Sequence, residues 1–304
     1  MSPRINVIDL FAGPGGLGEG FSSFADGKGR RPFRVVVSAE MDRAAHATLS
    51  LRALTRQIRW AGDAAAIGAL GELTRRLEAS GSLDVGQSAI ELGLGAAWER
   101  VAREALNIEL GTSAGDAALS GALGAARVDR DPLVLIGGPP CQAYSLAGRV
   151  RNRGKKGYEP EADERHFLYR QYLRILADRR PAVFVMENVK GILSSKIGGA
   201  SIFARILDDL QLPERALGRT AATGLRYALF PLAPGAGPQS DLLGGAATDP
   251  SQYIVRAEAF GVPQARHRVI LVGVREDVEV ATYATPVLPT VKERRSTEDV
   301  LSDL

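Results

Sequence analysis

The stretch DLFAGPGGLGEGF, residues 9–21, joins an apolar run to a series of glycines. Its first residues complete INVIDLF, residues 5–11, which has the composition of a buried strand. Gly13, Gly15 and Gly18 fit the pattern G-x-G-x-x-G, which is typical of a tight turn between a strand and a helix. The stretch therefore predicts a strand, a glycine turn and a helix in that order.

A second predicted strand, FRVVVSAE at residues 33–40, ends on Glu40. An acid at this place can bind ribose hydroxyls, while glycines in the preceding turn let the backbone approach a cofactor. We therefore expect a nucleoside-bearing cofactor at the carboxyl ends of the strands. Taken alone, the pattern also fits a dinucleotide site or a turn that binds nothing.

Further strands and helices alternate along the chain. Apolar segments predict strands at residues 56–63, 131–138, 181–189, 253–260 and 268–275. The last two are close enough in sequence to form a hairpin. Amphipathic patterns predict helices at residues 163–180 and 201–210. This alternation indicates an α/β fold with a doubly wound, mostly parallel sheet that carries helices on both faces.

Two regions interrupt the alternation. Residues 64–130 are rich in Ala, Gly and Leu and predict a helical insertion, with helices near 66–79 and 87–108. Residues 231–252 are rich in Gly and Pro and predict a surface loop. The sequence shows no internal repeat.

The composition is that of a globular protein, with 304 residues, 45% hydrophobic and 24% charged. No apolar stretch approaches the length of a membrane span, and the N-terminus lacks the pattern of a signal peptide. A single Cys cannot form an internal disulfide, so a reducing cytosol is the simplest compartment. The net charge of +3 and the pI of about 9.1 permit a polyanionic partner.

The only cysteine, Cys141, lies in GGPPCQAYS, residues 137–145. It follows a predicted strand, so it is expected at the same edge of the sheet as the glycine turn. Pro139 and Pro140 restrict the backbone and stiffen the exit from that strand. A rigidly presented thiol suits a nucleophile, which reacts as the thiolate. The alternative is a buried structural cysteine.

Two later segments add polar groups. Glu187 ends the predicted strand 181–189 against apolar neighbours, where a carboxyl can exchange protons; a surface or capping acid is the alternative. In QARHR, the period of a strand places Gln264, Arg266 and Arg268 on one face, where the arginines can grip a phosphate or a substrate carbonyl. A solvated strand edge is the alternative there, and His267 faces the other way as a bystander.

These segments, in this order, resemble the DNA (cytosine-5) methyltransferase family. DLFAGPGG resembles its first motif, GGPPCQAYS its catalytic P-C-Q motif, ENV the acidic motif that follows, and QARHR its Q-x-R-x-R motif. The resemblance covers roughly residues 5–275 apart from the insertion. It implies a Rossmann-like, S-adenosyl-L-methionine-dependent methyltransferase domain at 1–285, and it disfavours an NAD-type oxidoreductase.

The resemblance also implies catalytic roles. Cys141 would add to carbon 6 of cytosine, and Glu187 would hydrogen-bond or protonate the ring at N3. Arg266 would contact the base carbonyl, and Arg268 would support Glu187 or the backbone. A base that removes the carbon 5 proton is not identifiable and can be water.

For the cofactor, the resemblance implies contacts from both early strands and from the Cys segment. Phe11 would lie against adenine, Gly13 and Gly15 would line the methionine part, and Glu40 would bind ribose. The complete implied set of cofactor-binding residues is Asp9, Phe11, Gly13, Gly15, Glu40, Met41, Asp63 and Pro140. Asp63 would accept from the adenine amino group after a third strand. No metal site is expected.

For the substrate, the resemblance implies a cytosine flipped out of double-stranded DNA. Residues 146–160 match the loop that closes over the base. The basic run at 149–156 alone would indicate a solvated loop, but in this setting it is expected to contact phosphates. The implied substrate-binding residues are Gln142, Ser145, Arg149, Arg151, Asn188 and Gln264.

The chain departs from the family after the Q-x-R-x-R strand. Residues 286–304 resemble only the start of a target-recognition region. We therefore expect either a fragment or one subunit of a split enzyme, in a restriction–modification context in the cytoplasm of a bacterial or phage-infected cell, near the nucleoid. An RNA cytosine-5 methyltransferase and a non-catalytic scaffold subunit are the alternative functions.

Overall fold

The computed structural model describes residues 4–126, 132–140, 165–197, 200–219, 224–232 and 249–278, together with residues 291, 296 and 298. The chain forms two compact units, Met1–Gly137 and Gly138–Leu304.

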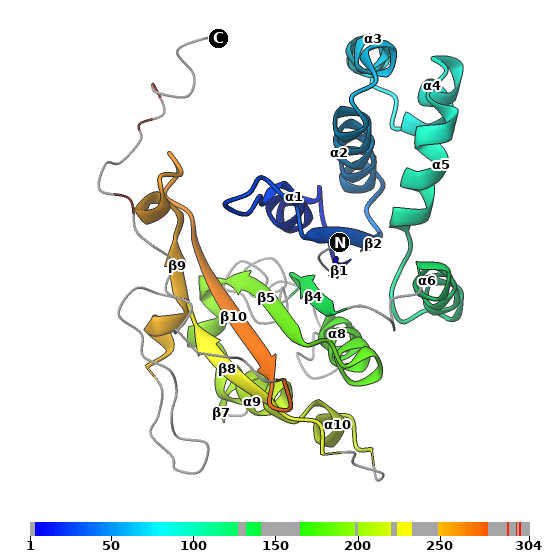
Figure 1. The fold of residues 1–304 in the computed structure, drawn as a ribbon. Coiled ribbons are helices and arrows are strands. Elements are labelled where there is room, and N and C mark those ends of the chain that lie inside the picture. Colours follow the sequence, from blue (N-terminus) through cyan, green and yellow to red (C-terminus); the bar gives the residue numbers. More distant parts are fainter. Residues whose placement is uncertain are drawn as a thin grey trace, which may run out of the picture. The chain divides into compact units, whose positions relative to one another are not determined.

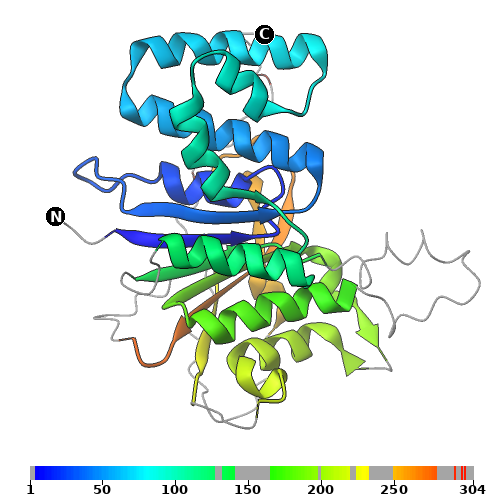
Figure 2. The same ribbon diagram turned by 90° about the vertical axis from the view of Figure 1, so that its right-hand side faces the viewer.

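The first unit contains a parallel sheet (Figure 1). Its strands are β1 (Ile5–Leu10), β2 (Phe33–Glu40), β3 (Ala105–Asn107) and β4 (Leu133–Gly137), in the order β3-β2-β1-β4. Residues 6–10 of β1 are all buried, so both faces of the sheet are covered. Helices α1 (Gly16–Ser23) and α6 (Ser113–Ala126) lie on opposite faces (Figures 1 and 2). The α/β prediction is confirmed, as are the strands at 5–11, 33–40 and 131–138.

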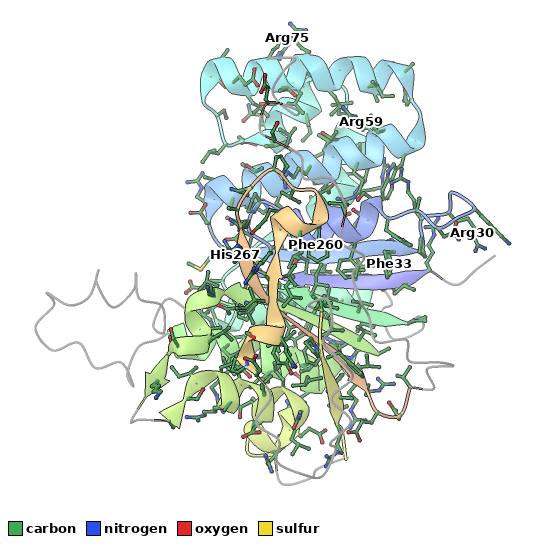
Figure 3. The ribbon with its side chains drawn as sticks, turned by 90° about the vertical axis from the view of Figure 1, so that its left-hand side faces the viewer. Arg30, Phe33, Arg59, Arg75, Phe260 and His267 are labelled. Carbon is green, nitrogen blue, oxygen red and sulfur yellow. The ribbon has the colours of Figure 1, made fainter. Side chains whose placement is uncertain are left out.

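Aromatic rings hold α1 against the start of β2. The ring of Phe33 (Figure 3) meets Phe21 and Phe24 edge to face, with ring centroids 5.2 and 5.9 Å apart. These contacts fix the direction in which the helix leaves the glycine turn.

The predicted strand at 56–63 is wrong, because this segment belongs to helix α2 (Arg43–Ala61). Asp42 caps the helix by accepting from the N–H of Ala45 at 2.8 Å, and Gly62 ends it with a φ of 70°. Leu54 and Ile58, four residues apart, are both buried. The apolar spacing is therefore that of a helix.

Helices α3 (Ala64–Ser80), α4 (Val85–Glu91) and α5 (Gly95–Glu104) follow α2 and precede β3. The predicted helix at 87–108 is split near Gly93, which has a φ of 77°, and its last residues form β3. Within the segment 64–130 that was expected to be a helical insertion, three helices precede β3 and α6 connects β3 to β4. Figures 1 and 2 show α3 on the side of α2 that faces away from the sheet.

The inserted helices have their own apolar core against α2. Buried side chains from all four helices form it, among them Leu54, Ile58, Leu70, Leu73, Val85, Ala89 and Val101. Burial of this area stabilises the layer independently of the residues at the carboxyl ends of the strands.

In the second unit, β10 (His267–Arg275) is the central strand of an antiparallel sheet. One edge pairs with β5 (Val183–Val189), and the other pairs with β8 (Tyr227–Pro231) and β9 (Ile254–Arg256). The predicted strands at 181–189 and 268–275 and the predicted hairpin are confirmed. The segment predicted as a strand at 253–260 is shorter, and β8 was not foreseen.

Helices α8 (Arg165–Arg179), α9 (Ile202–Gln211) and α10 (Pro213–Ala216) complete this unit, with the short pair β6 (Lys196–Ile197) and β7 (Ala200–Ser201). Single turns of 3₁₀ helix are η3 (Lys190–Ser194), η4 (Pro250–Tyr253) and η5 (Ala257–Phe260). Buried Phe184 meets the rings of Tyr172 and Tyr227 edge to face. A side chain at Gly273 would lie 2.0 Å from the Phe184 ring, so this packing requires glycine.

Across the described residues, no helix combines the length and the apolar character that crossing a bilayer requires.

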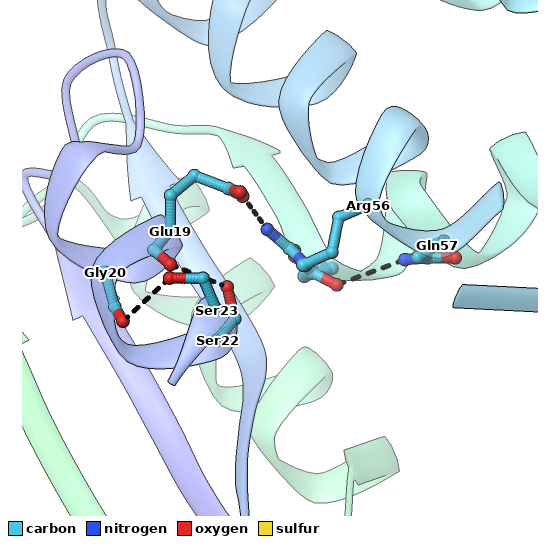
Figure 4. Close-up of polar contacts among 7 residues, drawn as sticks. Glu19, Gly20, Ser22, Ser23, Arg56 and Gln57 are labelled. Atoms are coloured by element: carbon cyan, nitrogen blue, oxygen red, sulfur yellow. Dashed lines mark hydrogen bonds and ion pairs between the residues drawn. The ribbon is translucent and has the colours of Figure 1, made fainter. Parts of the chain in front are cut away.

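One buried cation links three helices of the first unit (Figure 4). Arg56 of α2 forms ion pairs with Glu19 of α1 and Glu104 of α5, and the side chain of Gln57 donates to Glu104 at 3.1 Å. The Arg56 and Glu104 side chains are only 8% and 12% exposed. Burial raises the pKa of Glu104, and the charge of Arg56 opposes this rise.

Replacing Arg56 by Gln should lower the free energy of unfolding by about 3–5 kcal/mol, because it leaves two carboxyls without their counter-charge. Arg59→Gln, at an exposed position of the same helix, should change it by less than about 0.5 kcal/mol. Urea unfolding of both variants measures the difference. Equal losses would contradict a specific role for the Arg56 ion pairs.

Candidate active site

The glycine turn after β1 has a left-handed backbone at alternate residues. Phe11, Gly13 and Gly15 have φ values of 56°, 56° and 89°. The N–H of Gly15 donates to the carbonyl of Ala12 at 2.9 Å, which closes the turn. A side chain on Gly15 would lie 2.8 Å from Cδ1 of Leu49, whereas one on Gly13 would meet no atom within 4 Å. The turn is therefore packed at Gly15 and open at Gly13.

Glu40 fastens this turn to the end of β2. Its Oε2 accepts from the N–H of Gly13 at 2.8 Å, and its Oε1 accepts from the N–H of Asp42 at 2.7 Å. A carboxylate has about four acceptor positions, so each oxygen keeps capacity for a ligand hydroxyl. Met41, the next residue, is 57% exposed and offers an apolar surface beside these oxygens.

Asp9 does not lie at this surface, which corrects its expected role as a cofactor contact. It is fully buried in β1 beneath α1, where a side chain on Gly18 would lie 2.9 Å from its Oδ2. Neither oxygen makes a full hydrogen bond with a described residue. Burial raises the pKa of Asp9 to about 7, the nearby N–H of Gly18 offsets part of this, and the charge of Glu40 adds to it.

Asp63, expected to contact adenine, lies between two helices. It caps α3 by accepting from the N–H groups of Ala65 and Ala66 at 3.0 and 3.1 Å, and it follows a helix rather than a strand. The residue that ends the third strand is Asn107. Its side-chain amide donates to the carbonyls of Glu40 and Met41 at 2.9 and 3.1 Å. No pattern in the sequence marks Asn107, because the three residues of β3 directly follow a helical pattern.

The buried carboxyl of Asp9 makes stability depend on pH. The native state keeps this proton up to about pH 7, whereas the unfolded chain releases it near pH 4, so stability falls as the pH rises between these values. Asn at position 9 does not titrate, so the Asp9→Asn variant should not lose this stability. The difference in free energy of unfolding, variant minus unchanged protein, should therefore rise by about 3–4 kcal/mol from pH 4 to pH 7 and stay constant above pH 7.

Urea unfolding at several pH values checks this expectation. Asp26→Asn is a matched control, since Asp26 is partly exposed and its side-chain hydrogen bond with Arg30 lowers its pKa. Its effect should not change between pH 5 and 7. If the difference in free energy of unfolding between Asp9→Asn and the unchanged protein does not vary with pH, the carboxyl of Asp9 is ionised in the native state.

In the second unit, Glu187 and Arg268 form an ion pair between neighbouring strands. Nε of Arg268 lies 2.7 Å from Oε1 of Glu187, and each side chain is 25% exposed. The register pairs Ile270 with Glu187, so Arg268 reaches the carboxylate diagonally. A Cβ atom placed on Gly138 would lie 3.3 Å from Oε2, the second carboxylate oxygen of Glu187. Glycine at 138 therefore leaves space beside this oxygen.

Asn188 positions the backbone that leads to the cysteine, which corrects its expected role as a substrate contact. Its side chain is 4% exposed and donates to the carbonyl of Pro139 at 3.2 Å. Its Oδ1 accepts from the N–H of Val189 at 2.8 Å. Pro140, the last described residue of this segment, is partly exposed.

Gln264 and Arg266 lie in tight turns before β10, so the strand-face argument holds only for Arg268. Both side chains are exposed. His267 (Figure 3) is not a bystander, because its Nε2 lies 2.7 Å from Oε1 of Glu258 in η5. A hydrogen bond from its own backbone and the contact with His267 lower the pKa of Glu258. This pair fixes the start of β10.

Five predicted site residues lie outside the described part of the chain: Cys141, Gln142, Ser145, Arg149 and Arg151. The described residues nearest to them, Gly138 to Pro140, belong to the same unit as Glu187 and Arg268. The second unit thus offers a carboxylate held by a guanidinium, and the first offers a glycine turn with an anchored carboxylate.

Several known proteins are similar in sequence to this chain. The profile of the C-5 cytosine-specific DNA methylases matches residues 123–212 and 249–304. Type II methyltransferase M.Bpa9945I of Bacillus paralicheniformis is 27% identical over 311 residues, covering 98% of this chain and 60% of that protein. Type II methyltransferase M.BbvI of Brevibacillus brevis is 33% identical over 169 residues, covering 55% of this chain and 34% of that protein.

A solved structure of a putative DNA modification methyltransferase encoded within an E. coli prophage aligns with 98% of this chain and 54% of its own, at 19% identity and a TM-score of 0.48.

The first unit has an α/β fold, and the sequence matches are to methyltransferases. Over these residues the chain is similar to the C-5 cytosine-specific DNA methylases. It spans 60% of the length of M.Bpa9945I and 34% of that of M.BbvI.

Proposed function

We propose that this chain is the catalytic part of a DNA (cytosine-5) methyltransferase that uses S-adenosyl-L-methionine. The observation that carries the proposal is the ion pair between Glu187 and Arg268. Glu187 lies beside Gly138, which belongs to the segment that leads to Cys141. Similarity to the methylase family supports the reaction, and the names of the type II relatives support a restriction–modification role, for which we propose a cytoplasmic location.

The glycine turn fits the cofactor. Gly13 has open space beside its Cα, Glu40 has acceptor capacity for ribose hydroxyls, and exposed Met41 can cover an adenine face. Phe11 and Gly15 would complete the set of residues that hold the cofactor. Asn107, the last residue of the third strand β3, would take the role of adenine contact that was expected for Asp63. When bound, S-adenosylmethionine supplies an electrophilic methyl group on a sulfonium sulfur.

Cys141 would act as the nucleophile on the flipped base. Its thiolate forms a bond to carbon 6 of cytosine, and the electrons of the 5,6 double bond move to carbon 5, which becomes nucleophilic. After carbon 5 gains the methyl group, a base removes its proton and the electron pair expels the thiolate. Cys141 is thereby regenerated, and the 5,6 double bond returns.

Glu187 would act at N3 of the ring, where charge develops as the thiolate adds. Arg268 holds one of its oxygens, so the carboxyl is oriented before the base arrives. Arg266, which is exposed and precedes the strand, would contact the base carbonyl. Asn188 fixes the carbonyl of Pro139 and so limits the movement of the backbone before Cys141.

Recognition of double-stranded DNA would use residues beyond those matched here, since the chain spans 60% of the length of M.Bpa9945I. We propose 1–285 as the catalytic domain, Gln142, Ser145, Arg149, Arg151 and Gln264 as substrate contacts, and a target-recognition part or a second subunit as the source of sequence specificity. Strong sequence-specific methylation by this chain alone would contradict the proposal that sequence specificity comes from another part or a second subunit.

Substitution of Glu40 tests the cofactor site. Glu40→Gln should weaken S-adenosylmethionine binding at least about tenfold. The side-chain amide of Gln has one accepting oxygen, so it can accept a hydrogen bond from the N–H of Gly13 or of Asp42 but not through separate oxygens from both. Asp63→Asn should leave the affinity within about twofold, since Asp63 caps a helix. Isothermal titration calorimetry measures both. The reverse order of effects would restore Asp63 as the adenine contact.

A trapping assay tests the chemistry. With S-adenosylmethionine and DNA that contains 5-fluorocytosine, the fluorine blocks removal of the group at carbon 5, so a covalent complex should accumulate and be seen on a denaturing gel. Cys141→Ser should abolish it, and Glu187→Gln should slow it about a hundredfold or more. A complex that survives Cys141→Ser would refute the assigned nucleophile.

A further inference from the structure

A large groove of about 980 Å³ runs along β2 in the first unit, remote in sequence from the proposed catalytic residues. Its floor includes Val35 and Val36. One wall comes from α2 and α5, with Trp60 and Arg103, and the other comes from α6. Figure 2 shows β2 passing between α5 and α6. This cavity is called the β2 groove below.

The floor of the β2 groove is an open strand edge. On its inner side β2 pairs with β1 from Phe33 to Ala39, but on its outer side β3 pairs only with Ser38, Ala39 and Glu40. Within the described ranges, no strand lies beside residues 33–37 on that outer side. An unpaired edge of this kind can accept a further strand through its backbone groups.

The α6 wall leaves room for a chain. Its groove-lining residues are Gly121, Ala122, Ala125 and Ala126, which form one face of the helix with small side chains. Strands in a sheet lie about 4.8 Å apart, so an extended polypeptide fits such a slot beside β2. Duplex DNA is much wider than a single polypeptide strand and has no backbone groups that can pair with a strand edge.

The charge of the groove selects the occupant. Arg4, Arg34 and Arg103 line it and are exposed, and none of them forms an ion pair within the part of the chain that the structure describes. The carboxylate that lines the groove, Glu104, is paired with Arg56. The groove therefore presents guanidinium groups that suit acidic side chains.

We propose that the β2 groove binds an extended, acidic segment of a partner protein, which adds to the sheet as a strand beside residues 33–37. Backbone hydrogen bonds would supply affinity, and the arginines would select acidic side chains at alternate positions. This binding site is separate from the proposed methyl transfer, and its test does not depend on activity.

The probe is a fluorescent heptapeptide, acetyl-Asp-Val-Glu-Val-Asp-Val-Glu-amide, titrated with the full chain and followed by anisotropy. Ala125→Leu fills the slot, and Arg34→Glu with Arg103→Glu reverses its charge; each change should weaken binding about tenfold or more. Matched controls are Ser120→Leu on another face of α6 and Arg59→Glu on α2 (Figure 3), which do not line the groove and should stay within about twofold. Circular dichroism confirms that each variant folds.

Three results would overturn the proposal. One is no binding of the acidic peptide, and another is equal binding of its lysine analogue. The third is unchanged peptide affinity in Ala125→Leu. A short DNA duplex, titrated in parallel, separates the sources of negative charge. If the arginine reversals weaken duplex binding while the peptide is unaffected, the groove is a nucleic-acid contact and the peptide site is refuted.

Discussion

The rim of the first unit depends on one carboxylate that accepts from two strand connections at once. Glu40 takes the N–H of Gly13 from the turn after β1 and the N–H of Asp42 from the turn after β2. Both N–H groups lie where helices begin, so the negative charge also suits the positive ends of α1 and α2. The carboxylate of Glu40 joins the two turns. It thereby holds in place the residues with left-handed backbone, the start of α2 and the exposed Met41. Asn107 adds a third connection by holding the carbonyl of Glu40.

The second unit orients its carboxylate by a different means. Glu187 is fixed by a guanidinium from the adjacent strand rather than by backbone donors, and the start of that strand is held by the contact between His267 and Glu258. The carbonyl of His267 also accepts from Arg268 at 2.8 Å. A chain of polar contacts therefore runs from η5 to the acid proposed to act on the base. Such preorganisation lowers the cost of stabilising charge when it develops.

The sequence predicted the elements whose pattern is local and strong. The buried runs of β1, β2, β4, β5 and β10 and the glycine turn were all recognisable, since apolar runs and glycines need no tertiary information. The end of α2 was mistaken for a strand because Ile58 and Trp60 also alternate with polar residues. β3 was hidden because its three residues follow α5 without a break. Asp9 and Asn188 were assigned to ligands because a motif shows that a polar residue matters, whereas only packing shows which way it points.

The two glycines of the turn are constrained to different degrees. Gly15 is fixed twice, by its left-handed backbone and by Leu49, which leaves no room for any side chain. Gly13 is fixed only by its backbone, with open space around it. Asn and Asp tolerate left-handed conformations better than other residues with side chains. Relatives that share this turn should therefore admit Asn or Asp at position 13, while position 15 should remain glycine wherever α2 keeps this place.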